Sequence, residues 1–181
     1  MQLVLKKTVV LVGMMGSGKT AVGTALARLL GAPFLDSDAE IEKAADRTIA
    51  EIFDRDGEAF FRERETQIIS RLLDEECGVL SAGGGAYLSA RNRRIISDKG
   101  IAVWLRADQE LLWSRVRHKS TRPLLRTKNP RETLRQLCVQ REPNYALAEL
   151  AVDAKREYSV NQMADKVVAA LLSRRDVLEG R

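Results

Sequence analysis

The residues with the clearest chemistry lie at positions 13–20, which read Gly-Met-Met-Gly-Ser-Gly-Lys-Thr. This is the complete GxxxxGK[ST] pattern of a phosphate-binding loop, and it stands between a β-branched run and a helical pattern. Glycines let backbone N–H groups surround phosphate oxygens, and the following helix points its positive N-terminus at the same anions. Lys19 can reach the β- and γ-phosphates, and the Thr20 hydroxyl can bind Mg²⁺. The loop residues expected to bind the nucleotide are Gly13, Met14, Met15, Gly16, Ser17, Gly18, Lys19 and Thr20.

Two aspartates follow the next apolar run, in the segment Leu35-Asp36-Ser37-Asp38. On an extended segment, carboxylates at i and i+2 point the same way. The C-terminal ends of strands are also where α/β sheets place their ligands. One carboxylate could therefore join a magnesium shell while the other binds an acceptor hydroxyl. Alternatively, Asp38 only caps the N-terminus of a helix expected at 39–45.

Two further segments could bind an acceptor molecule. Residues 57–65 read GEAFFRERE, and Arg62 in this segment could bind an acceptor carboxylate with both guanidinium nitrogens. The alternative is a solvated helix face with i,i+3 charge pairs. Gly83-Gly84-Gly85 directly follows a predicted strand. Three glycines cost chain entropy and allow a ligand to approach backbone N–H groups closely, so a simple turn would seldom need all three.

A strongly basic stretch lies between residues 115 and 135, where eight basic residues accompany the single acid Glu132. Such a stretch attracts anions. It contains Arg122-Pro123-Leu124-Leu125, and a mobile basic loop can close over a phosphate site and supply an arginine to the developing charge. The alternative is a solvated loop or one that binds nucleic acid. However, residues 114–144 contain no aromatic side chain on which bases could stack.

The scaffold that must position these residues has the pattern of an α/β protein, because short apolar runs alternate with longer amphipathic stretches. Strands are expected at 8–12, 33–36, 79–82, 101–105 and 150–152. Helices are expected at 18–30, within 38–75, at 89–98, from about 108, at 130–145 and at 159–173. The helical region 38–75 should be interrupted at 46–48 and 54–57, and 118–128 should form a mobile loop. Residues 174–181 should be frayed or disordered.

Length and composition fit one domain covering residues 1–181. No apolar run approaches the roughly 20 residues needed to span a bilayer. The two cysteines lie far apart and no secretory signal is evident, so we expect free thiols and a cytoplasmic protein. His118 is the only histidine, and no spacing suggests a zinc site.

Taken together, six segments resemble the shikimate kinase family. They are GMMGSGKT at 13–20, FLDSD at 34–38, GEAFFRERE at 57–65, AGGG at 82–85, RPLL at 122–125 and REPNY at 141–145. The phosphate-binding loop is widely shared, but the combination of the other five is specific. The resemblance implies a three-layer P-loop NTPase fold of the nucleoside-monophosphate-kinase type, with a five-stranded parallel sheet. It also implies an acceptor-binding region at about 38–75 and a lid at about 115–128.

The resemblance further implies the reaction and its ligands. ATP and one Mg²⁺ ion would be required, and the γ-phosphate would pass to the 3-hydroxyl of shikimate. The protein would act as a monomer, without nucleic acid or membrane partners. Asp36 would reach magnesium through water.

The residue roles that the resemblance implies fall on both sides of the site. Asp38 would bind the shikimate hydroxyls and act as a base or orient the attacking oxygen. The residues implied for the shikimate carboxylate and its pocket are Arg62, Arg141, Gly83, Gly84 and Gly85. The arginines implied for ATP are Arg122 on the phosphates and Arg115 and Arg156 near adenine. The catalytic set is Lys19, Asp38 and Arg122.

Three rival interpretations remain at this stage. The first is a kinase for another hydroxy acid or sugar acid, such as gluconate. The second is a nucleotide-dependent nucleic-acid-binding protein, which predicts salt-sensitive binding. The third is a catalytically idle nucleotide-binding module, against which the intact Lys19, Thr20, Asp36 and Asp38 argue.

Overall fold

The computed structural model describes residues 1–118 and 123–181. Its central sheet has five strands in the order β3-β4-β2-β5-β6, and every neighbouring pair is parallel. The strands are β2 (Thr8–Val12), β3 (Phe34–Asp36), β4 (Val79–Ser81), β5 (Gly100–Arg106) and β6 (Leu150–Asp153). The middle strand β2 is buried along its whole length, as expected for a β-branched run covered on both faces. The predicted five-stranded parallel sheet is therefore confirmed.

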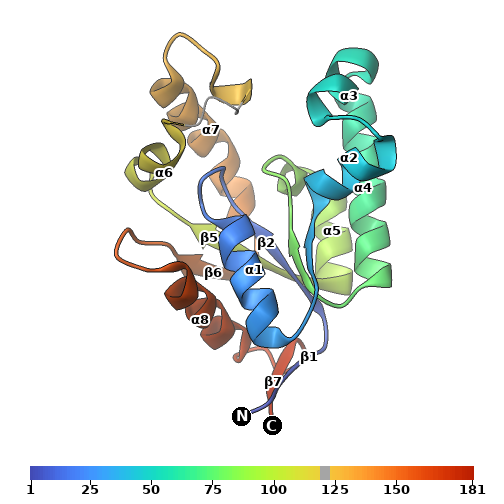
Figure 1. Ribbon diagram of the computed structural model, residues 1–181, viewed down its shortest axis with the longest axis vertical. Coiled ribbons are helices and arrows are strands. Elements are labelled where there is room, and N and C mark those ends of the chain that lie inside the picture. The colour runs from blue at the N-terminus through green and yellow to red at the C-terminus, as the bar shows by residue number, and fades with distance from the viewer. Residues whose placement is uncertain (119–122) are drawn as a thin grey trace.

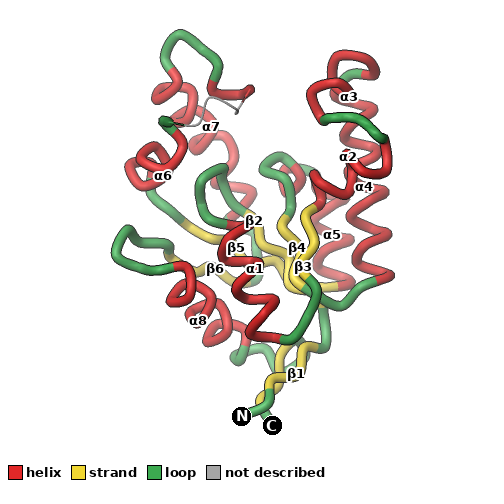
Figure 2. Tube along the Cα trace, viewed as in Figure 1, coloured by secondary structure: helices red, strands yellow, loops and turns green. Residues whose placement is uncertain are grey.

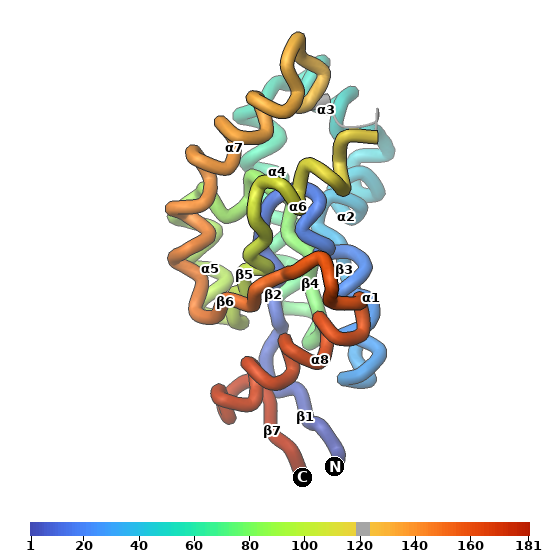
Figure 3. The backbone as a smooth tube through the Cα atoms, turned by 90° about the vertical axis from the view of Figure 1, so that its left-hand side faces the viewer, coloured from blue at the N-terminus to red at the C-terminus, as the bar shows by residue number. Residues whose placement is uncertain are grey.

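Helices cover both faces of this sheet. The helices are α1 (Lys19–Leu30), α2 (Ser37–Ala45), α3 (Ile49–Asp56), α4 (Glu58–Glu75), α5 (Ala90–Lys99), α6 (Gln109–Val116), α7 (Pro130–Tyr145) and α8 (Val160–Leu171). Figure 3 shows α1 and α8 on one side of the strands and α5 and α7 on the other, which gives three layers. Two short 3₁₀ turns complete the chain, η1 (Ala86–Leu88) and η2 (Pro123–Leu125). No helix in the described ranges is both long enough and apolar enough to cross a membrane.

Two groups of helices rise on either side of the C-terminal ends of the strands (Figure 1). One group is α2, α3 and α4, which correspond to the expected acceptor region; the other is α6 with the start of α7. The expected lid begins inside α6 and contains η2, and residues 119–122 within it lie outside the described part of the chain. Loops and turns at this edge of the sheet connect the strands to both groups (Figure 2). Ligand-binding residues are expected here in open α/β sheets.

The predicted turn at 54–57 is shorter than expected. Helix α3 continues through Asp56, and Gly57 alone separates it from α4, with a φ of 85° that side chains disfavour. Across this break the rings of Phe53 and Phe61 contact each other, with centroids 4.8 Å apart. This aromatic contact helps to fold the two helices against each other.

The prediction that residues 174–181 are frayed is wrong. Strand β7 (Leu178–Gly180) pairs antiparallel with β1 (Leu3–Leu5), a strand that the sequence analysis missed. Val177 and Leu178 are fully buried. The tail is therefore held by apolar burial and by a ribbon that joins the two ends of the chain, which lie side by side in Figure 1.

Removal of residues 177–181 is expected to destabilise the protein. Two fully buried aliphatic side chains contribute about 1.5–3 kcal/mol each, so the free energy of unfolding should fall by about 3–6 kcal/mol. Thermal or denaturant unfolding of the shortened chain measures this loss. Arg181→Ala, which changes only an exposed side chain, is the control. An unchanged unfolding midpoint after the deletion would show that the tail does not contribute to the core.

Candidate active site

The phosphate-binding loop lies between β2 and α1, at the centre of the sheet edge. Gly18 precedes α1 in a left-handed conformation with φ of 99°. A side chain at Gly16 would meet Val116 at 2.7 Å, so α6 packs closely against the loop. The Lys19 ammonium donates to the carbonyls of Gly13 and Met14 at 2.6 and 3.2 Å and thus lies over the loop. These contacts place the Lys19 ammonium group near the N-terminus of α1, so that both can bind the same phosphate group.

One polar atom of this loop indicates a ligand. The Ser17 hydroxyl is buried and has no hydrogen-bond partner among the described residues. Buried polar groups are normally hydrogen-bonded, so an orphaned hydroxyl inside an anion-binding loop fits a phosphate oxygen. Met14 is buried in the core and Met15 packs partly against it, which anchors the loop.

The acidic pair has a different geometry from the predicted one. Asp36 ends β3, and α2 begins at Ser37, so the two carboxylates do not share one extended segment. Asp36 caps α2 by accepting a hydrogen bond from the Ala39 N–H at 3.1 Å. The alternative in which Asp38 is the cap is therefore also wrong, because Asp38 lies within the first turn of the helix. The cap fixes the start of α2 and leaves Asp38 in a half-buried position near the strand ends.

The charge state of Asp38 reflects this position. Burial raises the pKa of its carboxyl above the usual value, and the negative charge of Asp36 raises it further. The positive charges of Lys19 and Arg62 act in the opposite direction. Asp38 therefore lies within electrostatic reach of both the phosphate-binding loop and the acceptor helices.

The glycine segment after β4 brings three of the predicted residues together. It forms a tight turn in which the Ala86 N–H donates to the Gly83 carbonyl at 3.0 Å. A β-carbon at Gly83 would lie 2.6 Å from an Asp38 carboxylate oxygen. At Gly84 it would lie 2.8 Å from the Arg141 guanidinium, and at Gly85 it would lie 2.5 Å from that of Arg62. The missing side chain of each glycine thus leaves room for one of the predicted site residues. Asp38 comes from α2, Arg141 from α7 and Arg62 from α4.

The two arginines beside this turn differ in their partners. Arg141 is buried, and its Nε has no hydrogen-bond partner among the described residues. Arg62 is bonded to Glu65, with 2.9 Å between Nη1 and Oε1. The Glu65 side chain is 1% exposed. Burial raises the pKa of Glu65, while the charges of Arg62 and Arg141 lower it. The buried Glu65 carboxylate pairs directly with Arg62, so the Arg141 guanidinium keeps its capacity to bind an acidic acceptor.

The sequence analysis included Glu65 in its motif but gave it no role. The alternative interpretation of segment 57–65 as a solvated helix face does not hold for Glu65, whose side chain is 1% exposed. Ser37 is a second residue without an assigned role. It is fully buried, and its hydroxyl accepts a hydrogen bond from the Gly83 N–H at 3.0 Å, which ties the acidic segment to the glycine turn.

Arg115 and Arg156 lie at the other edge of the phosphate-binding loop. Arg115 Nη1 donates to the Gly16 carbonyl at 3.0 Å. Burial and the nearby charge of Arg156 lower the pKa of Arg115, so the two guanidinium groups are neighbours. Arg156 is exposed on the loop after β6. The predicted phosphate contact Arg122 lies outside the described residues.

The residues present fit a magnesium ion that is bound together with a nucleotide. No three His, Cys, Asp or Glu side chains cluster as a metal site in residues 1–118 and 123–181. Mg²⁺ is usually held by one or two protein ligands together with substrate phosphates and water. Thr20 in the first turn of α1 and Asp36 at the end of β3 supply hard oxygen ligands of this kind.

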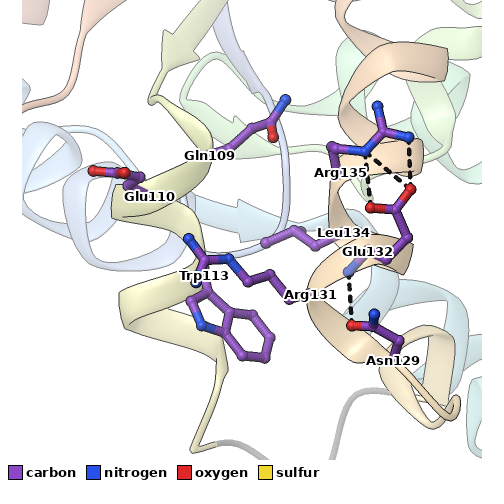
Figure 4. Close-up of a pocket in the computed structure, with 8 residues that line it drawn as sticks. All are labelled: Gln109, Glu110, Trp113, Asn129, Arg131, Glu132, Leu134 and Arg135. Carbon is purple, nitrogen blue, oxygen red and sulfur yellow. Dashed lines mark hydrogen bonds and ion pairs between the residues drawn. The ribbon is translucent and has the colours of Figure 1, made fainter.

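A separate hollow of about 360 Å³ lies between α6 and α7 (Figure 4). Its lining residues are Gln109, Glu110, Trp113, Asn129, Arg131, Glu132, Leu134 and Arg135. Arg135 is already paired there with Glu132 at 2.6 Å. None of the glycine-turn residues lines this hollow, so the candidate active site remains at the strand ends.

The family model for shikimate kinase matches residues 15–172. The chain belongs to the shikimate kinase family. Its relatives include a shikimate kinase of Ruegeria pomeroyi, which is 63% identical over 97% of this chain and 90% of its own length. A shikimate kinase of Cereibacter sphaeroides is 65% identical over 97% of this chain and 87% of its own length.

Solved structures agree with this family membership. A shikimate kinase from Acinetobacter baumannii, in complex with shikimate, has a TM-score of 0.86 and 40% identity. The match covers 93% of this chain and 94% of that protein. A gluconokinase from Sinorhizobium meliloti has a TM-score of 0.59 at 20% identity, which shows a shared fold alone. Both resemble this chain in the P-loop kinase architecture, but the sequence similarity favours the shikimate kinases.

Within this shikimate kinase family member, Glu65→Gln is expected to raise KM for the acceptor about tenfold, because Arg62 loses a buried charge-assisted hydrogen bond. The raised pKa of Glu65 adds a pH effect. As the pH falls through this pKa, the wild-type carboxylate is protonated and its acceptor KM should rise, whereas the variant should lack this step. Steady-state kinetics across pH with Glu63→Gln, an exposed neighbour, as the control measures both effects. Equal pH profiles in wild type and variant would contradict the role of Glu65.

Proposed function

We propose that this protein transfers the γ-phosphate of ATP to the 3-hydroxyl of shikimate, giving shikimate 3-phosphate and ADP. This reaction is a step of chorismate and aromatic amino acid biosynthesis. The observation that carries the proposal is the convergence of Asp38, Arg62 and Arg141 on the three-glycine turn, with Lys19 nearby. This arrangement suits a small acceptor that has a carboxylate at one end and a hydroxyl at the other.

The acceptor is held by opposite charges at its two ends. Arg62 and Arg141 bind the carboxylate, because guanidinium groups match its planar geometry with two hydrogen bonds. Asp38 accepts a hydrogen bond from the reacting hydroxyl. The two arginines and Asp38 hold the acceptor at its two ends. They therefore orient it so that one hydroxyl, rather than a neighbouring one, faces the γ-phosphate.

Phosphoryl transfer needs accurate placement and charge neutralisation more than covalent chemistry. Asp38 orients the attacking oxygen and takes its proton, a role that its raised pKa favours because a stronger base accepts a proton more readily. Lys19 and the N–H groups of the loop neutralise the phosphates. Arg122 binds the same phosphates from the lid, and Arg115 and Arg156 bind near adenine.

Thr20 and Asp36 would hold magnesium, with Asp36 in the outer shell. The ion would supply positive charge to the phosphates of ATP. The Asp36 carboxylate has a second task in the fold, because one of its oxygens caps α2. The ion and the acceptor helix are thereby linked through one residue.

The two cysteines indicate the cellular compartment of the protein, and its exposed apolar side chains indicate its oligomeric state. Cys77 and Cys138 are free, which supports a reducing compartment, the cytoplasm.

The larger exposed apolar side chains, such as Leu29, Phe60 and Val139, lie on different helices. This scatter supports a monomer that binds small molecules. Light scattering at several concentrations tests the oligomeric state.

The product of the reaction tests the proposal. Incubation with Mg-ATP and shikimate, followed by phosphorus–proton correlation NMR, should show one new phosphate ester coupled to the proton on carbon 3. A reaction without MgCl₂ is the control. An ester on another hydroxyl would contradict the assigned placement of the acceptor, and the absence of any ester would contradict the proposed function.

A further inference from the structure

Tyr145 is the last residue of α7, one helical turn beyond Arg141. Its side chain is fully buried, and its hydroxyl donates a hydrogen bond of 2.5 Å to the Gly84 carbonyl. Burial raises the pKa of this phenol, whereas the nearby charge of Arg141 lowers it. The same hydroxyl therefore contacts the glycine turn and lies beside the arginine that faces it.

The contact with Gly84 fixes the orientation of a flexible peptide unit. Glycines flank this peptide on both sides, so the chain itself restrains it weakly. In a planar trans peptide, the C=O of Gly84 and the N–H of Gly85 point in opposite directions. Because Tyr145 holds the carbonyl, the Gly85 N–H is directed away from Tyr145. No residue in the described ranges accepts a hydrogen bond from the N–H of Gly84 or Gly85, so both donors can serve a ligand.

The contact with Arg141 fixes a buried cation. A β-carbon built on Gly84 would lie 2.8 Å from Arg141 Nη1 and 3.9 Å from the Tyr145 hydroxyl, so both groups pack on the same side of that glycine. Arg141 is 7% exposed, and its Nε has no partner among the described residues. Its Nε is therefore not held by any described residue, and the neighbouring phenol is a group that can orient the guanidinium.

We propose that Tyr145 is a positioning residue that makes the enzyme selective for acceptors bearing a carboxylate. Its hydroxyl holds Arg141 and the Gly84–Gly85 peptide in one arrangement, so that the guanidinium and the free N–H donors are already oriented before the acceptor binds. This inference rests on the proposed function, because it assigns the carboxylate of shikimate to Arg141.

Tyr145→Phe tests this role, since it removes the hydroxyl and keeps the ring. KM for shikimate should rise about tenfold, whereas kcat and KM for ATP should change less than about threefold. The same comparison is made with a neutral analogue of shikimate in which the carboxylate is replaced by a hydroxymethyl group. Its kcat/KM should change less than about twofold, so that discrimination between the two acceptors falls about tenfold.

Tyr87→Phe is the matched control. Tyr87 is also buried, lies in η1 directly after the glycine turn, and has its pKa raised by burial and by the charge of Glu149. Its variant should keep both acceptor constants. Gly84→Ala is a second test, because the added methyl group would displace Arg141 and should reproduce the selective rise in KM.

Equal losses for shikimate and its neutral analogue in Tyr145→Phe would overturn the proposal, since they would indicate a general effect on the fold. An unchanged KM for shikimate would overturn it as well. The wild-type protein is assayed in the same series. If the wild-type protein turns over shikimate while Tyr145→Phe shows no selective effect, only the positioning role is wrong. If the wild-type protein does not turn over shikimate, the proposed function is wrong, and so is this inference.

Discussion

Asp38→Asn is expected to lower kcat about a thousandfold, because the amide cannot take a proton from the attacking hydroxyl. KM for ATP should change less than about twofold, since Lys19 and the phosphate-binding loop remain intact. Steady-state kinetics with each substrate varied in turn measures both constants. Asp46→Asn is the control, because Asp46 is exposed at the other end of α2 in a left-handed conformation that asparagine also adopts. Equal losses in kcat and ATP binding would contradict the role of Asp38.

The same substitution should leave the protein at least as stable as the wild type. The folded state raises the pKa of Asp38, so folding disfavours its charged form. Below the unfolded pKa the carboxyl is protonated in both states and this penalty is absent; it develops as the pH rises through the folded pKa. At neutral pH the wild type carries the full penalty and the amide does not. Unfolding midpoints should therefore favour Asp38→Asn at pH 7, with a smaller difference in acid.

Arg141→Ala is expected to raise KM for shikimate about a hundredfold, because truncation of a buried charge that pairs with the acceptor carboxylate costs several kcal/mol. KM for ATP should be unaffected. Arg135→Ala on the same helix is the control, since Arg135 is exposed and pairs with Glu132 one turn away. Added guanidinium ion should restore part of the activity of Arg141→Ala but none of that of Asp38→Asn. An unchanged KM for shikimate would show that Arg141 does not bind the acceptor.

The elements with strong local signals could be predicted from the sequence. The buried run 8–12, the glycine pattern after it and the C-terminal Gly31 define β2, its loop and α1, and the structure has all three. Helix α7 begins at Pro130 and ends at Tyr145 as predicted, because Asn129 caps it and proline is tolerated in its first turn. The convergence of Asp38, Arg62 and Arg141 could not be predicted from periodicity, and only the family resemblance suggested it.

The errors have physical causes in long-range or ambiguous contacts. Either of two aspartates that lie two residues apart could cap the same helix. Only the structure shows that α2 begins directly after Asp36, which is therefore the cap. The β1–β7 ribbon joins segments at opposite ends of the chain, and each is three residues long, so no local pattern marks it. Glu65 and Tyr145 act through partners brought close by folding, and their positions in helical patterns resemble those of ordinary surface and core residues.

The most direct test is ADP release from Mg-ATP by the wild-type protein, measured by a coupled assay with shikimate, quinate, gluconate, nucleoside monophosphates and nucleic acid as separate acceptors. We predict rapid turnover with shikimate and only background rates with the others. If shikimate is inert and another acceptor drives turnover, the phosphate-binding loop keeps its role. In that case Arg62, Arg141 and the glycine turn bind a different ligand, and the central claim is wrong.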